Sequence, residues 1–181
     1  MSGRNIFEDL RKAGGPSARR CVFISHNSVD KAFARKIAQA VMSLGADVYF
    51  DEADKELQDA TAMGNERAIV ECILRGLSSC THLLGIVTSS TKDSWWVPFE
   101  IGGAMGKARS CAHIVSEQVQ SLPEYIKTAE LLLDRWDLSK WVAKVSGEKH
   151  DVLKESIERH AGAFLGMVPR IRHKSEIRFY G

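Results

Sequence analysis

Short apolar runs alternate with amphipathic stretches along the chain. The runs lie at 21–25, 47–50, 82–88, 112–115 and 131–133. Their nearly continuous apolar character is typical of strands that are covered on both faces. Between them, apolar residues recur at helical spacing. The pattern predicts an α/β fold with an open parallel sheet and helices on both of its faces.

Helices are expected in the stretches between these runs. The first follows Ser28, which we expect to cap its N-terminus, and Gly45 is expected to end it. The second contains the apolar stripe of 69–77, after an acidic, polar segment at 51–64 that we expect to be a loop. The last helix is predicted to carry the apolar residues of 152–165.

The predicted helix at about 97–107 carries the most information. Pro98 suits its first position, where the missing N–H costs little. Glu100 would then lie in the first turn, where the helix dipole favours the ionised carboxylate. Gly102 and Gly103 each cost about 1 kcal/mol relative to Ala in a helix interior. We therefore expect tight packing, or the close approach of another group, at these glycines.

The length of 181 residues, 44% of them hydrophobic and 27% charged, is ordinary for one globular domain. We expect an appendage at 1–19, the domain at 20–168 and a basic tail at 169–181. No apolar run approaches the ~20 residues that a membrane helix needs, and the first residues lack the apolar core of a secretory signal. A cytoplasmic protein that does not enter membranes is the expectation.

Charge and cysteine content exclude several classes of protein. The net charge of +2 gives no argument for a nucleic-acid partner, and the basic tail is expected to be solvated or packed on the domain. No two of the four cysteines have C-x-x-C spacing, and no histidines are spaced as metal ligands. We expect buried, reduced thiols and no metal site.

Polar side chains follow the predicted strands at their carboxyl ends, where ligands bind in open α/β sheets. Ser25, His26 and Asn27 follow the first strand, Asp51 follows the second and Ser89 follows the third. No glycine fingerprint for a dinucleotide or for a P-loop is present. The hydroxyl, imidazole and amide groups after the first strand suit a phosphate or sugar at a helix N-terminus, although on these residues alone simple helix capping is the better explanation.

Trp95, Trp96 and Glu100 form a W-x-x-x-E segment at the start of the third predicted helix. Helical spacing would place Trp96 near Glu100. Either Trp could instead fill the core or an interface, and Glu100 could simply be a charge in the first helical turn. The pattern alone is weakly diagnostic.

In their order and spacing, these segments together resemble a TIR (Toll/interleukin-1 receptor) domain of the bacterial kind. The residues that carry the resemblance are those of 22–30, 47–52, 86–101 and 122–126. The resemblance covers roughly 20–165, most of the chain. It implies a flavodoxin-like open parallel sheet of five strands with helices on both faces.

The resemblance also implies an activity, the cleavage of NAD+ at the bond between nicotinamide and ribose. Glu100 matches the catalytic glutamate of such domains. The polar strand ends around it, and the two tryptophans, would then bind the substrate: Ser25, His26, Asn27, Asp51, Ser89, Trp95 and Trp96. NAD+ would be the substrate, and no cofactor or metal is implied. Nicotinamide leaves as a neutral molecule, so one carboxylate suffices and no general acid is needed.

A lone bacterial TIR protein resembles the signal-producing component of antiphage systems such as Thoeris. It would make ADP-ribose, or a cyclic or conjugated ADP-ribose that a separate effector protein senses, and would assemble through TIR–TIR contacts. The segment 51–64 departs from many relatives, because it is acidic and lacks proline. A non-catalytic TIR scaffold that acts through homotypic contacts is the alternative, and a nucleoside 2-deoxyribosyltransferase-like enzyme is a third.

Overall fold

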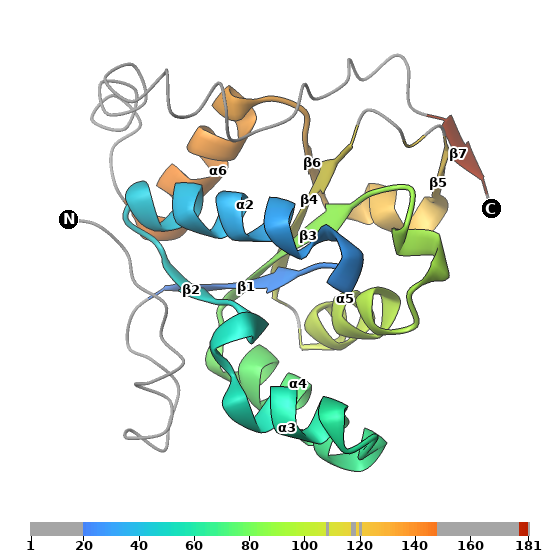
Figure 1. The fold of residues 1–181 in the computed structure, drawn as a ribbon. Coiled ribbons are helices and arrows are strands. Elements are labelled where there is room, and N and C mark those ends of the chain that lie inside the picture. Colours follow the sequence, from blue (N-terminus) through green and yellow to red (C-terminus); the bar gives the residue numbers. More distant parts are fainter. Residues whose placement is uncertain (1–19, 108, 117–118, 120, 148–177, 181) are drawn as a thin grey trace.

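A five-stranded parallel sheet forms the centre of the protein in a computed structural model that describes residues 20–107, 109–116, 119, 121–147 and 178–180 (Figure 1). The strand order is β2-β1-β3-β4-β6, and every neighbouring pair is parallel. The five strands are β1 (Cys21–Ser25), β2 (Asp47–Tyr49), β3 (His82–Val87), β4 (Ser110–Val115) and β6 (Glu130–Leu132). This arrangement confirms the predicted open parallel α/β sheet.

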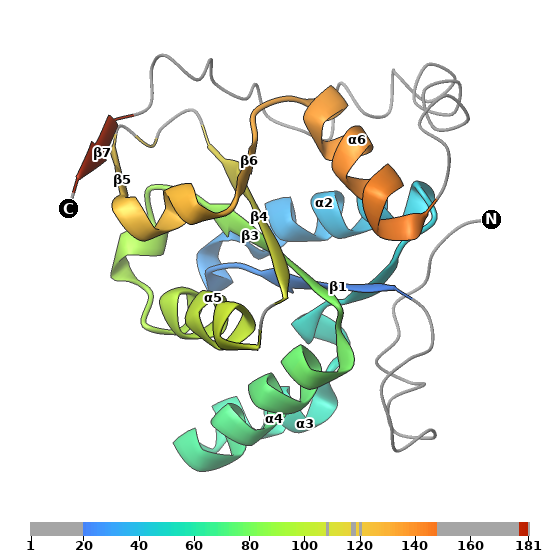
Figure 2. The ribbon, with the colours of Figure 1, turned by 180° about the vertical axis from the view of Figure 1, so that it is seen from behind.

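Helices cover both faces of the sheet, as Figures 1 and 2 show from opposite sides. The helices α2 (Lys31–Ser43) and α6 (Arg135–Ser146) lie on one face, and α4 (Glu66–Ser79) and α5 (Trp96–Gly106) lie on the other. The helix α3 (Lys55–Ala62) packs against α4. Parallel strands need such crossovers, so both faces of the sheet are buried.

Short elements connect these layers at the carboxyl ends of the strands. Four 3-10 helices are described: η1 (Ser28–Asp30), η2 (Asp51–Ala53), η3 (Thr91–Asp93) and η4 (Glu124–Thr128). A second, two-stranded parallel sheet pairs β5 (Ser121–Pro123) with β7 (Arg178–Tyr180). The segment expected to be a connector at 122–126 is therefore part strand and part 3-10 helix.

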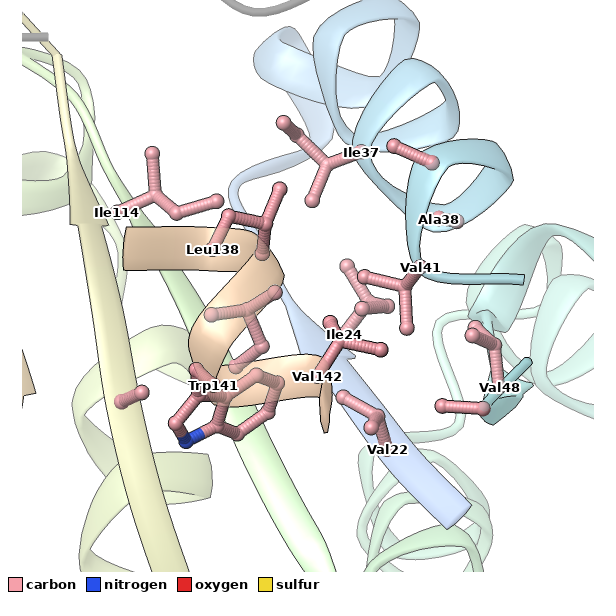
Figure 3. Close-up of a cluster of buried hydrophobic side chains, with 14 of the residues drawn as sticks. Val22, Ile24, Ile37, Ala38, Val41, Val48, Ile114, Leu138, Trp141 and Val142 are labelled. Atoms are coloured by element: carbon pink, nitrogen blue, oxygen red, sulfur yellow. The ribbon is translucent and has the colours of Figure 1, made fainter. Parts of the chain in front are cut away.

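One hydrophobic core lies between the sheet and the helices α2 and α6 (Figure 3). Ile37 and Val41 on α2 project toward Ile24 on β1, and Trp141 on α6 fills the space beside β4. Trp141 is 2% exposed. Burial of large apolar side chains is the main stabilising term of such a layer, roughly 1.5–3 kcal/mol for each fully buried aliphatic side chain.

The second core lies under α4 and α5 and depends on close approach at two glycines. A Cβ on Gly76 of α4 would lie 2.6 Å from the Tyr49 ring, which stacks on Phe23. A Cβ on Gly103 of α5 would lie 3.2 Å from Leu77. Tight packing therefore explains the glycine at position 103. This is one of the two explanations expected from the sequence. Gly102 has open space at its Cβ position.

Two local predictions are corrected near the first two strands. Asn27, and not Ser28, supplies the cap after β1, because its side chain accepts a hydrogen bond from the backbone N–H of Val29. The segment 51–64, expected as a loop, folds into η2 and α3. The side chain of Asp54 caps α3 by accepting from the N–H of Leu57 at 3.0 Å. Gly45 does end α2, with a φ of 94°.

Further corrections concern α5 and α6. The helix α5 begins at Trp96, so Pro98 is its third residue, and Glu100 lies beyond the first turn. The helix α6 was not predicted, although Asp134 caps it through two backbone N–H groups. The helix predicted over 152–165 lies outside the described residues. So do the whole of the predicted appendage at 1–19 and most of the basic tail.

In the part of the chain that the structure describes, no helix has both the length and the apolar character needed to cross a bilayer. Three of the four cysteines, Cys21, Cys72 and Cys80, are buried, and Cys111 is half-buried. All four are free thiols, as expected.

Candidate active site

The carboxyl group of Glu100 is buried where α5 crosses the end of β1. Ser25 is the last residue of β1, and its Oγ donates a hydrogen bond to Glu100 Oε2 at 2.5 Å. Ser25 is fully buried, and Glu100 is 8% exposed. A short hydrogen bond between two buried groups is well ordered, so the strand end fixes the position of the carboxyl group.

Burial also decides the protonation of Glu100. Loss of solvation is the largest effect on the Glu100 pKa and raises it, the hydrogen bond from Ser25 lowers it, and the nearby carboxylate of Asp51 raises it, which leaves the pKa at about 8. The expectation that a helix dipole keeps this carboxylate ionised is therefore wrong. Glu100 lies beyond the first turn of α5, and desolvation outweighs the dipole there.

A cavity of about 250 Å³ opens beside Glu100. It lies between the loop after β1, the helices α3 and α4, and the start of α5. Its lining comprises His26, Asn27, Ser28, Lys31, Asp51, Leu57, Gln58, Thr61, Ile69, Ile73, Ser94, Trp96 and Glu100. Carboxylates and an imidazole thus share a small cavity with apolar walls, which is the usual composition of a ligand site.

His26 and Asp51 face each other across this cavity without a hydrogen bond. His26 Nε2 lies 3.7 Å from Asp51 Oδ1, and both atoms are buried with no hydrogen-bond partner among the described residues. The His26 ring packs on Phe50, with centroids 5.1 Å apart, so its orientation is fixed. Burial raises the pKa of Asp51, while His26 and Lys31 oppose that shift. Two unsatisfied polar atoms at a cavity wall suit the hydroxyl groups of a ligand.

The loops that carry these residues are tied together by hydrogen bonds. Asp30 Oδ2 accepts from Thr88 Oγ1 and from Ser90 Oγ, both at 2.6 Å. Asn27 Nδ2 donates to the carbonyl oxygen of Ser90 at 2.9 Å. The loop after β1 is thereby held against the loop after β3, which makes the rim of the cavity rigid.

The structure brings most of the candidate residues together. His26, Asn27, Asp51, Trp96 and Glu100 line the cavity, and Ser25 stands directly behind Glu100. Ser89 is exposed and is not part of the lining. Trp95 is 92% exposed and is also absent from the lining.

Sequence reasoning missed the wall that α3 and α4 supply. Leu57, Thr61, Ile69 and Ile73 line the cavity from these two helices. The available signal was the helical spacing of Leu57 and Thr61 after the capping Asp54, which a prediction of a loop overlooked. Lys31, at the start of α2, was also missed.

Comparison with known proteins shows which family this chain belongs to. A family model described as TIR domain matches residues 22–115. The match covers more than half of the chain and includes every residue of the cavity lining. The chain belongs to the TIR domain family. Among residues that the structure describes in this TIR domain, no group of three or more His, Cys, Asp or Glu side chains could hold a metal ion.

One curated relative of this TIR domain is a Bacillus cereus (strain MSX-D12) protein named "Probable 3' cyclic ADP-D-ribose synthase ThsB'". The two are 24% identical over 102 residues, which is 56% of this chain. The chain spans about half the length of that relative, 52%. The resemblance to Thoeris-type bacterial TIR proteins is thereby confirmed.

Proposed function

We propose that this TIR domain cleaves NAD+ at the bond between nicotinamide and ribose, with Glu100 as the catalytic carboxylate. The observation that carries the proposal is the placement of Glu100: a buried carboxyl group, fixed by Ser25, in a cavity whose lining also holds two buried polar atoms without a hydrogen-bond partner among the described residues. Membership in the TIR family and similarity to a relative named as a cyclic ADP-ribose synthase support it.

The cleavage needs charge stabilisation more than proton transfer. The bond between ribose C1′ and the nicotinamide nitrogen breaks, and its electron pair stays on that nitrogen. Nicotinamide, cationic in the substrate, leaves neutral, and positive charge develops on the ribose ring. Glu100, ionised at that moment, stabilises this charge in a site with little water. His26 Nε2 and Asp51 Oδ1 would hold the ribose hydroxyls.

Because the pKa of Glu100 is raised, binding of the substrate contributes to the ionisation of this carboxyl group. With a pKa of about 8, Glu100 is mostly protonated at neutral pH in the free protein. A cationic nicotinamide ring beside it favours the carboxylate, because opposite charges lower the pKa of an acid. Binding of NAD+ would therefore release a proton to solvent and charge the catalytic group only when substrate is present.

The cavity volume limits which part of NAD+ lies inside it. About 250 Å³ is below the ~300–1,000 Å³ of sites that enclose a drug-sized ligand. It suits the nicotinamide and its ribose, with Trp96 and Ile73 against the aromatic ring. The diphosphate would lie at the rim near Ser28 and Lys31, where a backbone turn and a cation favour an anion. The adenosine half would extend beyond the cavity, where a second TIR domain could cover it.

We further propose that the product is a cyclic or conjugated ADP-ribose, or free ADP-ribose, and that it serves as a signal in antiphage defence. The outcome depends on whether water, a ribose hydroxyl or an adenine nitrogen attacks ribose C1′. A separate effector protein would sense the product. The name of the Bacillus cereus relative is the support for a cyclic product.

Product analysis tests the proposal. The full chain at high concentration is incubated with NAD+, and the products are separated by liquid chromatography and identified by mass. Wild type should release nicotinamide together with one ADP-ribose species, whose mass and retention distinguish hydrolysis from cyclisation. Glu100→Gln should release both products at a rate lower by a factor of about 10²–10³. The exposed carboxylate of Glu66 on α4 supplies the matched control, and Glu66→Gln should behave as wild type.

Two results would contradict the proposal. Nicotinamide release by Glu100→Gln at the wild-type rate would remove Glu100 from the chemistry. No release by wild type at any protein concentration, including after addition of a lysate of phage-infected cells, would favour the non-catalytic scaffold.

A further inference from the structure

His113 is a buried imidazole for which the proposed chemistry has no role. It lies in the middle of β4 and is fully buried. Neither Nδ1 nor Nε2 has a hydrogen-bond partner among the described residues. Burial lowers its pKa to about 4, so the ring is neutral near pH 7. A buried imidazole with two unsatisfied nitrogens is costly, and such groups call for a functional explanation.

The sheet register places His113 in one row with the Glu100 site. Ser25 on β1 pairs with Gly85 on β3, and Gly85 pairs with His113 on β4. Side chains alternate along a strand, and Phe23, Leu83 and Val115 in these strands belong to the core under α4 and α5. The side chains of Ser25 and His113 therefore project to the face of the sheet where Glu100 lies, and Gly85 lies between them.

Gly85 leaves the space between Ser25 and His113 free of any side chain. A Cβ built on Gly85 would lie 2.5 Å from His113 Nδ1, 3.1 Å from Cε1 and 3.7 Å from Cγ. The imidazole ring of His113 therefore lies over β3, and Nδ1 is the ring atom nearest Gly85. The ring is displaced from β4 toward the strand that carries Ser25. Neighbouring strands are ~4.8 Å apart and Ser25 lies two strands from His113, so a ring over β3 covers about half of their separation and leaves room for one bridging water.

Glu100 is the titratable group that α5 brings to this region. The other buried residues on that helix are Val97, Ile101 and Ala104. From β6 the ring neighbours Leu131, and the described residues of 119–126 contribute buried Val119, Leu122 and Ile126. On β4 itself the half-buried thiol of Cys111 lies two residues before His113, and its pKa is raised by burial. Lys92 of η3 and Lys127 of η4 are exposed.

We propose that His113 is a positioning residue for Glu100 that acts through the Ser25 hydroxyl. When Glu100 is ionised, Ser25 uses its one proton to donate to Oε2, as the structure has it. When Glu100 is protonated on Oε2, its own O–H donates to Ser25 Oγ, and the Ser25 proton turns toward His113 Nδ1 and reaches it through one water. The neutral imidazole therefore stabilises the protonated form of Glu100, and the row changes its hydrogen bonds when substrate drives ionisation.

Nuclear magnetic resonance of the imidazole nitrogens tests this coupling without any enzyme assay. The full chain is labelled with ¹⁵N, and the ring signals are followed from about pH 5 to pH 9.5. His113→Gln identifies the His113 signals. The Nδ1 signal should shift with a midpoint near the Glu100 pKa of about 8, well above the pKa of His113 itself. The shift should vanish in Glu100→Gln and in Ser25→Ala, both of which keep His113.

A wild-type Nδ1 signal that stays constant over this range would overturn the proposal, as would a step that persists in Glu100→Gln or in Ser25→Ala. These measurements concern the coupling alone, so they stand whether or not the protein cleaves NAD+.

The consequence for catalysis rests on the proposed function. Loss of the acceptor in His113→Phe should move the rise of kcat/KM with pH, which reports the free protein, about one pH unit lower, the effect of a single hydrogen bond on a pKa. His113→Gln keeps an acceptor and should restore the wild-type midpoint. A purely structural role would lower kcat/KM at every pH and leave the midpoint in place, and that result would count against the proposal.

Discussion

Ionisation of Glu100 should make the stability of the protein fall as pH rises. The carboxyl group has a pKa of about 8 in the folded protein and 4.5 as its ordinary value. Below pH 4.5 it is protonated in both states. Between the two pKa values the folded protein keeps a proton that the unfolded chain has lost, so each pH unit lowers the free energy of unfolding by ~1.4 kcal/mol. Above about pH 8 the effect is complete.

The size of this effect follows from the two pKa values. Their separation corresponds to roughly 5 kcal/mol of lost stability over the full range, and to roughly 4 kcal/mol between about pH 5 and pH 8.5. That is a large fraction of the 5–15 kcal/mol by which proteins of this kind are usually stable. Glu100→Gln removes the ionisation while keeping a group of the same shape beside Ser25.

Urea unfolding at several pH values measures how the stability of Glu100→Gln differs from that of wild type. The free energy of unfolding of Glu100→Gln minus that of wild type should increase by roughly 4 kcal/mol from about pH 5 to pH 8.5. Other titrating groups, Asp51 among them, contribute to both proteins and largely cancel in this difference. The exposed Glu66 provides the control, and Glu66→Gln should follow the wild-type curve throughout.

A constant difference between Glu100→Gln and wild type over this range would refute the reasoning. It would mean that the folded protein solvates the ionised carboxylate as well as water does. Glu100 would then be ionised in the free protein, and binding of NAD+ would release no proton from it.

Two further pairs of variants test the packing and the cavity wall. Gly76→Ala should destabilise the protein by roughly 1–3 kcal/mol in urea unfolding, because its Cβ would lie 2.6 Å from the Tyr49 ring, whereas Gly102→Ala should stabilise it by about 0.5–1 kcal/mol; equal effects would contradict this packing. Trp96→Ala should raise the KM for NAD+ severalfold, and Trp95→Ala should leave KM unchanged, because only Trp96 lines the cavity. A larger KM effect from Trp95→Ala would move the substrate outside this cavity.

The five strands of the main sheet and their parallel direction followed from local pattern, because each buried strand is a short apolar run and parallel topology follows from strand–helix alternation. Helix α6 also carried a readable pattern. Leu138, Trp141, Val142 and Val145 have helical spacing after a capping Asp134, but no helix was predicted there. Helix α3 gave a weaker local signal, because it has few apolar residues and its stability comes from packing on α4.

The candidate site, too, could be predicted from the sequence only in part. Glu100, His26, Asn27 and Asp51 were predictable, because residues at the carboxyl ends of parallel strands and at one helix start converge. The protonation of Glu100 was not predictable, since it depends on how deeply α5 packs over Ser25. The row that links Ser25 to His113 through Gly85 depends on strand register, which the sequence alone does not specify.

The most direct test of the central claim is the initial rate of nicotinamide release from NAD+ by three proteins at equal concentration. Loss of one carboxylate that stabilises developing charge should lower the rate by a factor of about 10²–10³. Glu100→Gln should show that loss, and wild type and Glu66→Gln should share one rate. Equal rates for all three proteins would contradict the assignment of Glu100 as the catalytic group.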